Sequence, residues 1–306
     1  MGSVVFPDYV EKFIESTTQY LEFFKAGIKF TEEYPETQAR YYEISTAGGE
    51  VELIVHRTSA SLDQPVGEYR VRAIARLTPK IAGVVRGLEM VLNRYATLGA
   101  LVVTEKDASV LCQCIIDSAF SDTTAGILAA AIVNSRPSIL ESYRRAVAQD
   151  PPPSVEILSA WTDLDFEQIH YDYAHLGIGS LGTRRWTTTI FPHGTLSLDA
   201  VHNNPYWGGG LLCLSRIPEE ILAGEGGRVD VNALNSWENL VGDAPSFGGW
   251  CRDTNDIVFT QFFPNMMKGL PNCTDLLISW ARSRIRSASQ LVEFEREFQK
   301  GQQKAH

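Results

Sequence analysis

The chain has no uninterrupted apolar run of about 20 residues, and no charged segment followed by a long apolar stretch opens it. We therefore expect neither a membrane-spanning helix nor secretion by a cleaved signal, and we predict a cytoplasmic protein. Basic residues are also few: 27 Lys and Arg stand against 37 Asp and Glu, a formal net charge of -10. Such a balance repels phosphate backbones, so we expect no nucleic-acid partner, whereas a basic protein partner is compatible with it.

Cysteine is scarce, and its spacing argues against both a disulfide framework and a metal site. There are five cysteines, an odd number at irregular intervals. Cys112 and Cys114 lie two apart in a strand-like run and share a face, but no second pair offers the two further thiolates that a metal would need. We expect no metal and interpret the cysteines as buried, reduced residues in a reducing compartment.

Motifs of nucleotide and calcium sites are missing as well. Neither a Walker lysine nor an EF-hand loop is present, and the segment Gly177-Ile178-Gly179-Ser180-Leu181-Gly182 matches G-x-G-x-x-G in the wrong context. The dinucleotide form of that motif lies between a strand and a following helix, whereas here a helix precedes it and a strand follows. We interpret it as a glycine-rich loop between a helix and a strand, and we expect no cofactor.

The first half of the sequence predicts a helix, three strands, a helix, two strands and a closing helix. Apolar residues recur at helical spacing over 10–24 and 81–95. Alternating and apolar runs predict strands at 41–44, 51–55, 69–77, 101–104 and 110–116, with a turn at Gly48-Gly49. The closing helix begins near Thr123 and reaches Arg145, and Pro137 should kink or divide it because proline cannot donate to the helical ladder.

The second half predicts the same order. A helix over 166–175, with Asp163 or Asp165 as its cap, precedes the other elements. Strands are predicted at 185–191, 196–200, 211–215, 250–251 and 257–263, with a helix interrupted near 224–227 that runs towards 240, and a last helix over 277–291. The two late hairpins, at 102–113 and 250–260, correspond most closely.

A proline-rich link, Pro151-Pro152-Pro153, separates the halves. We therefore predict an α+β protein with two tandem modules, at 1–150 and 154–306. Each module has the order α-β-β-β-α-β-β-α, with an antiparallel sheet backed by helices, and the two pack as a pseudo-twofold pair.

This order of elements resembles the type III secretion chaperone-like fold, which YbjN-like proteins also use. The resemblance is one of topology over most of the chain, so no residue roles come with it. It implies that the chain binds other proteins rather than turning over a substrate. It also implies pairing of modules, which a tandem copy would achieve within one chain as an internal pseudo-dimer, so that the protein is a monomer of this kind or a homodimer.

The segment from His202 to Gly210 is the clearest candidate for a binding loop. Asn203, Asn204 and a proline suit a turn, but Tyr206 and Trp207 are not needed for one. Large amphipathic rings beside amides are common on binding surfaces. Two interpretations stay open: the rings cover the edge of the core, or they form a partner-binding loop that Arg185 and Trp186 approach.

An enzymatic alternative places a site among the histidines and aspartates of the second half. His175, His193 and His202, with Asp172 or Asp199, could serve hydrolytic or acid–base chemistry if they converge. Their spacing does not put them on one helical face, and a triad is recognised by geometry, so we assign no catalytic residue.

A basic row lies on the polar face of one predicted strand. Arg70, Arg72 and Arg76 alternate with apolar residues and are expected to be solvated and paired with nearby acids, with an acidic-peptide surface as the alternative. The hypothesis from sequence is thus a non-enzymatic, chaperone-like or adaptor protein that binds another protein or a peptide segment.

Overall fold

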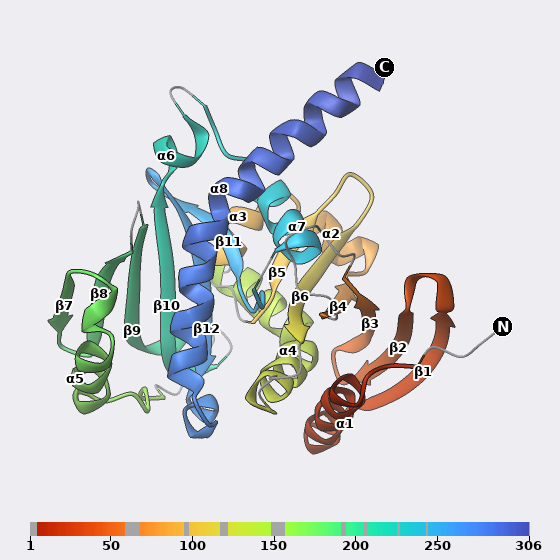
Figure 1. Ribbon diagram of the computed structural model, residues 1–306, viewed down its shortest axis with the longest axis horizontal. Helices are drawn as coiled ribbons and strands as arrows, with labels where there is room; N and C mark the ends of the chain where they lie inside the picture. The colour runs from red at the N-terminus through yellow and green to blue at the C-terminus, as the bar shows by residue number, and fades with distance from the viewer. Residues whose placement is uncertain are drawn as a thin grey trace.

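Two six-stranded antiparallel sheets, one in each half of the chain, organise the computed structural model (Figure 1). The structure describes residues 5–58, 68–94, 98–116, 122–147, 157–190, 194–204, 207–224, 227–242 and 244–305. The proline-rich link at 151–153 lies outside these residues. The prediction of an α+β protein with two similar antiparallel modules in tandem is confirmed.

The first module runs from α1 to α4. Its elements are α1 (Asp8–Phe23), β1 (Gly27–Tyr34), β2 (Ala39–Thr46), β3 (Gly49–Arg57), β4 (Tyr69–Arg76), α2 (Pro79–Val85), α3 (Glu89–Arg94), β5 (Ala100–Val103), β6 (Ala108–Ile116) and α4 (Asp122–Val147). The strands pair in the order β1-β2-β3-β4-β6-β5. Ala47 and Gly48 form the turn between β2 and β3, one residue before the predicted Gly48-Gly49. Gly49, the first residue of β3, takes a φ of 113°, which favours glycine.

The second module repeats this plan. Its elements are α5 (Asp163–Asp172), β7 (Gly179–Gly182), β8 (Arg185–Ile190), β9 (Gly194–Asn204), β10 (Gly208–Pro218), α6 (Glu219–Ala223), α7 (Val231–Val241), β11 (Gly249–Asp253), β12 (Asp256–Pro264), the 3-10 turn η3 (Asn265–Gly269) and α8 (Cys273–Ala305). The pairing order, β7-β8-β9-β10-β12-β11, matches that of the first sheet position by position.

Each module has one strand more than the sequence predicts, at the outer edge of its sheet. β1 is mostly exposed and so lacks the alternation of apolar and polar residues that reveals a half-buried strand. β7 lies within the glycine-rich segment for which the sequence predicts a loop, and it pairs with β8 from Gly179 to Gly182. The middle helix of each module is also split in two, into α2 and α3 or α6 and α7.

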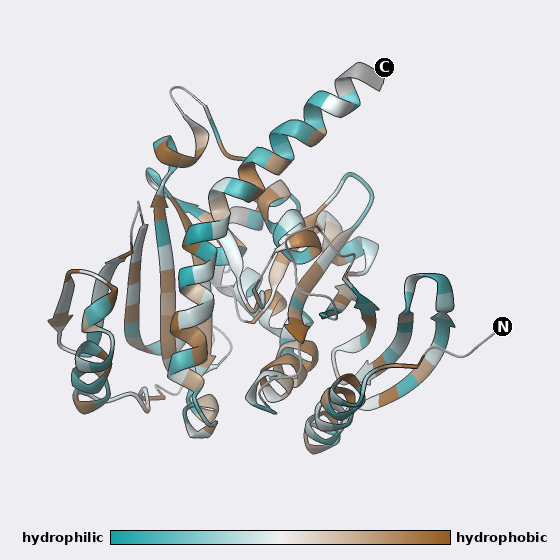
Figure 2. Cartoon of the chain, in the orientation of Figure 1, coloured by the Kyte–Doolittle hydropathy of each residue, from teal (hydrophilic) through white to brown (hydrophobic). Residues whose placement is uncertain are grey.

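Helices cover one face of each sheet, and apolar side chains alternate along the strands beneath them (Figure 2). α1 and α4 pack on the first sheet, and α8 packs on β9 and β10 of the second. The buried apolar residues of the two modules form one continuous cluster rather than two separate interiors. The two modules therefore share a single hydrophobic core.

The N-cap of α5 and the effect of Pro137 on α4 differ from the prediction. The N-cap of α5 is Thr162, and Asp165 completes a capping box by accepting from the Thr162 backbone N–H at 2.6 Å. Asp163 is the first helical residue. Pro137 does not divide α4, which continues on both sides of it. The proline ring packs on the β2–β3 turn, where a Cβ added at Gly48 would lie 3.0 Å from it.

The C-terminal end of α7 lies on the face of the first sheet that α1 and α4 leave open. The Arg70 Nη2 donates to the Gly242 carbonyl at 3.0 Å, and the Arg72 Nε donates to the Asn239 carbonyl at 3.0 Å. These contacts place two cations at the negative end of a helix. The expected solvated arginine row is therefore wrong for Arg70 and Arg72, which join the modules, and burial lowers the pKa of Arg72.

A backbone bridge reinforces this junction. Gln113 of β6 and Ser246 exchange N–H···O bonds of 3.3 and 2.7 Å. The Gln113 side chain donates to the Ala244 carbonyl at 2.7 Å. The two sheets stay separate, but a strand of one module and the segment before β11 of the other are fixed against each other.

A fully buried ion pair holds the same segment from the other side. The Glu238 carboxylate of α7 pairs with the Arg284 guanidinium of α8, and neither side chain reaches solvent. Glu238 also accepts from the Trp250 indole N–H at 3.0 Å, and Arg284 donates to the Ala244 and Pro245 carbonyls. The Arg284 guanidinium lies 4.8 Å from the Phe259 ring centroid, so its remaining surface is covered as well.

In the part of the chain that the structure describes, no helix combines the length and the apolar character that crossing a membrane requires.

We predict that Arg284→Met lowers the free energy of unfolding by roughly 3–5 kcal/mol, because it leaves the Glu238 carboxylate buried without its counter-charge. The double variant Glu238→Leu, Arg284→Met removes both charges and should lose much less. Urea denaturation followed by circular dichroism measures all three proteins. Arg286→Met, on the exposed face of the same helix, is the control and should change stability by no more than about 0.5 kcal/mol. A double variant as unstable as the single one would contradict the electrostatic explanation.

Candidate functional site

The predicted binding loop comprises the end of β9, the connection between β9 and β10, and the start of β10, so His202 to Asn204 belong to a strand rather than to a loop. His202 accepts from the Ser159 backbone N–H at its Nδ1, at 2.9 Å, and the Asn204 Oδ1 accepts from the Trp207 N–H at 2.9 Å. Trp207 packs partly buried against the core. Pro205, Tyr206 and the Asn203 side chain lie outside the described residues. His202, Asn204 and Trp207 thus close the end of the hairpin, and a role in partner binding stays a prediction.

The two residues expected to approach this loop are used otherwise. Trp186 is only 1% exposed and packs in the core beneath α5 and β7, so its ring is not on the surface. Arg185 is largely exposed, but its guanidinium pairs with the Asp199 carboxylate on the neighbouring strand. That pair raises the pKa of Arg185. Trp186, a partner-binding candidate from the sequence, is therefore not accessible to a partner.

The residues of the enzymatic alternative each have a separate local partner. The Asp172 carboxylate accepts from Gln168 at 2.8 Å, while the His175 Nδ1 lies 3.1 Å from the Asp172 carbonyl. Asp199 pairs with Arg185, and His202 contacts Ser159. His193 lies outside the described residues. Among the residues that the structure describes, no group of three His, Cys, Asp or Glu side chains could hold a metal ion.

All five cysteines are buried and free. Burial raises the pKa of Cys112 and of Cys273 to about 12, and it raises that of Cys114 well above its ordinary value. A thiol is a nucleophile and a metal ligand only as the thiolate. These thiols therefore stay protonated near neutral pH and serve as small apolar residues of the core.

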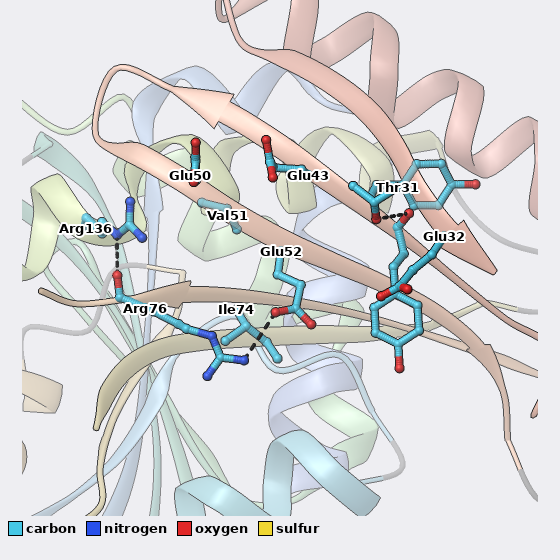
Figure 3. Close-up of a pocket in the computed structure, with 11 residues that line it drawn as sticks. Thr31, Glu32, Glu43, Glu50, Val51, Glu52, Ile74, Arg76 and Arg136 are labelled. Atoms are coloured by element: carbon cyan, nitrogen blue, oxygen red, sulfur yellow. Dashed lines mark hydrogen bonds and ion pairs between the residues drawn. The ribbon is translucent and has the colours of Figure 1, made fainter. Parts of the chain in front are cut away.

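A groove of ≈ 460 Å³ lies on the first sheet, and we call it the open-face groove (Figure 3). Side chains of β1 to β4 line it, and Arg136 of α4 closes one end. It occupies the part of the sheet that the end of α7 does not cover. Glutamates dominate its polar lining, namely Glu32, Glu43, Glu50 and Glu52.

The two arginines of the groove are already engaged. The Arg76 Nη2 donates to the Glu52 carboxylate at 3.3 Å. The Arg136 Nε donates to the Arg76 carbonyl at 2.8 Å, and its Nη1 donates to the Gly48 carbonyl at 3.2 Å. Figure 3 shows Glu52 and Arg76 pointing toward each other, with Glu43 and Glu50 further along the β2–β3 hairpin. Four carboxylates against two cations leave the groove acidic.

One cross-strand row explains the charge of the groove. Lys29 of β1 lies opposite Glu43 of β2, and Glu43 lies opposite Glu52 of β3. Like charges placed directly opposite each other destabilise a sheet. Departures of this kind from the rules of stable folding concentrate at functional sites. The Glu43–Glu52 pair is therefore the feature of the groove that most favours a cationic ligand.

Comparison with known proteins adds little to this geometry. No family model matches the chain, and no curated protein matches it. Among solved structures, it is similar to a fused permuted hexameric shell protein from the RMM microcompartment, with 13% identity over 74% of this chain and 86% of that chain, and a TM-score of 0.14. A TM-score that low supports no argument about fold or function.

The opposed carboxylates of Glu43 and Glu52 should repel each other measurably. A double-mutant cycle of Glu43→Gln and Glu52→Gln should show a repulsive coupling of about 0.2–1 kcal/mol in the free energy of unfolding, because the two charges face each other across the strands. Added salt should reduce it. The cycle of Lys29→Gln with Glu43→Gln, in the same row, is the control and should show a coupling of opposite sign. Coupling energies of the same sign in both cycles would contradict this arrangement of charges across the strands.

The second prediction concerns alkaline pH. A thiol titrates near 8.5 in the unfolded chain, whereas in the folded protein the pKa of Cys112 is raised to about 12. Its stabilising contribution is therefore complete below about pH 8.5 and is lost as pH rises towards 12, by roughly 1 kcal/mol per pH unit. Urea unfolding at pH 8 and pH 10 measures the loss. Cys112→Val should lose less stability over that interval than the wild-type chain, and equal losses would count against a buried, protonated thiol.

Proposed function

We propose that the chain is a non-enzymatic, chaperone-like or adaptor protein that holds an extended segment of another protein in the open-face groove. The observation that carries the proposal is the position of the groove: it lies on an uncovered sheet face directly beside a free edge strand. A protein segment that extends a sheet gains backbone hydrogen bonds from the edge and specificity from side-chain pockets next to it.

The edge strand suits this role. β1 is the outermost strand of its sheet and eight residues long. One row of its N–H and C=O groups therefore faces away from β2. The bulge between Phe30 and Glu32, together with the charges of Lys29 and Glu33, guards this edge against indiscriminate pairing. β7, at the same position in the second module, is only four residues long, so the first module offers the longer edge.

The volume and charge of the groove indicate which side chains the bound segment carries. A space of ≈ 460 Å³ accommodates a few large side chains rather than a folded domain. Glu52 pairs with Arg76, and Glu50 interacts electrostatically with Arg136, so the four glutamates of the groove still outnumber its two arginines. We expect lysine or arginine at alternate positions of the bound segment, because alternate residues of a strand point to one face.

The wider setting is compatible with this proposal. The order of elements resembles the chaperone-like fold of type III secretion and YbjN-like proteins, apart from the additional edge strand. This resemblance implies that the two modules correspond to the pair that single modules form as homodimers. Five free, buried cysteines fit a reducing compartment such as the cytoplasm.

The test uses a synthetic peptide of eight residues, the length of β1, that alternates lysine with threonine. We expect it to bind the wild-type chain in isothermal titration at low salt. We also expect Glu43→Lys to weaken binding by about tenfold or more, since that variant replaces attraction by repulsion at the centre of the row.

Two controls make the result specific. Glu167→Lys, on the exposed face of α5, makes the same change of net charge and should leave affinity within about twofold of wild type. A peptide that alternates glutamate with threonine should not bind. Equal weakening by Glu43→Lys and Glu167→Lys, or no binding of the lysine peptide at all, would refute the proposed site.

A further inference from the structure

A second hollow lies where the two modules meet, on the opposite side of the first sheet. Its volume is ≈ 380 Å³, and α1, α4 and η3 line it. α1 and α4 lie side by side at the base of the molecule in Figure 1. The walls of the cavity are apolar: Phe23 and Phe24 lie at the C-terminal end of α1, and Met266, Met267 and Leu270 lie in or directly after η3.

Small residues on α4 create the space. Gly126 and Ala130, one turn apart, form the side of the cavity that larger residues would fill. A Cβ added at Gly126 would already lie 3.3 Å from the Tyr20 ring. Gly126 thus allows the Tyr20 ring to lie close to α4, and the small Ala130 side chain leaves space that a larger apolar residue would fill.

The mouth of the cavity exposes large apolar side chains. Phe23 is 75% exposed and Met266 is 51% exposed. Exposed apolar groups around an apolar hollow mark a ligand site more often than a packing fault. Methionine side chains adapt to the shape of what they contact, so a wall formed by Met266 and Met267 accommodates flat and branched groups alike.

A single polar anchor lies at one end. The Tyr20 ring lines the cavity, and its hydroxyl donates to the Asp122 Oδ2 at 3.4 Å. Asp122 is exposed, and within the described part of the chain no lysine or arginine pairs with it. Asp122 does not itself line the cavity, but it is bonded to the Tyr20 hydroxyl that does. An apolar space whose polar end is a hydroxyl bonded to a carboxylate complements a cation attached to an apolar body.

The cavity is also continuous with the established module interface. The Thr123 hydroxyl, next to Asp122, donates to the Pro271 carbonyl of the second module at 2.8 Å. An occupant would therefore contact α1 and α4 on one side and η3 on the other. Binding there adds contacts between the modules rather than separating them.

We propose that this cavity binds a small organic cation with an apolar body. Its ammonium group lies at Asp122 beside the Tyr20 hydroxyl, and its body lies between the α1 phenylalanines and the η3 methionines. The site is distinct from the open-face groove and does not depend on the function proposed for it.

The test compares two probes of equal shape and opposite charge, 4-phenylbutylamine and 4-phenylbutyrate, by isothermal titration near neutral pH. Because the amine places its charge at Asp122, we expect it to bind about tenfold or more tighter than the carboxylate. Asp122→Asn should remove this preference while it leaves weak binding of both probes. Asp107→Asn, an exposed aspartate of the β5–β6 turn, is the control and should retain the preference.

Two further variants test the position of the apolar body. Ala130→Leu fills the cavity, and Met266→Lys places a cation at its mouth. Each should weaken amine binding by about tenfold or more. Circular dichroism would show whether Ala130→Leu disturbs folding. Because Met266 is half exposed, Met266→Lys should fold normally and then tests the site by itself. Equal affinity of the wild-type chain for the two probes, no binding of the amine, or amine binding unchanged by Met266→Lys would each overturn the proposal.

Discussion

The buried Glu238–Arg284 ion pair is the constraint on which the rest of the structure depends. Two charges removed from water need further hydrogen bonds besides their mutual attraction, and here the partners come from α7, α8, β11 and residues 244–245 in the segment before β11. That segment also pairs with Gln113 of the first module. The requirement to satisfy one ion pair thus fixes the position of α7 relative to both sheets.

The position of α7 in turn defines the open-face groove. Its C-terminal carbonyls lie over Arg70 and Arg72 on the first sheet, so the helix covers the side near β6 and leaves β1 to β3 uncovered. A longer α7, or one at another angle, would fill the groove. The helix ends at Val241 before Gly242, and the arginines satisfy carbonyls that the helix itself leaves without partners. The groove is therefore a by-product of how the modules join.

Much of the fold could be predicted because its elements have clear periodicity. The helices with buried stripes and the strands with alternating residues were found, as was the duplication, because burial on one side imposes a pattern on the sequence. The edge strands were missed because burial is what produces that pattern, and β1 and the glycine-rich β7 are largely exposed. The burial of Trp186 was not predicted, because a strand pattern alone does not show how completely other elements cover a side chain. The single continuous core could not be derived from two separate patterns.

The candidate site was hidden for a different reason. Glu43 and Glu52 stand apart in the sequence and look like ordinary solvated acids, and only the β2–β3 register places them opposite each other. Register depends on the exact turn residues, and the turn lies at Ala47-Gly48, one residue before the predicted Gly48-Gly49. The unusual feature is therefore a pair rather than a residue. A single sequence shows which groups are present, whereas an unfavourable contact between two like charges exists only once the strands are aligned, and this contact distinguishes the groove from an ordinary polar surface.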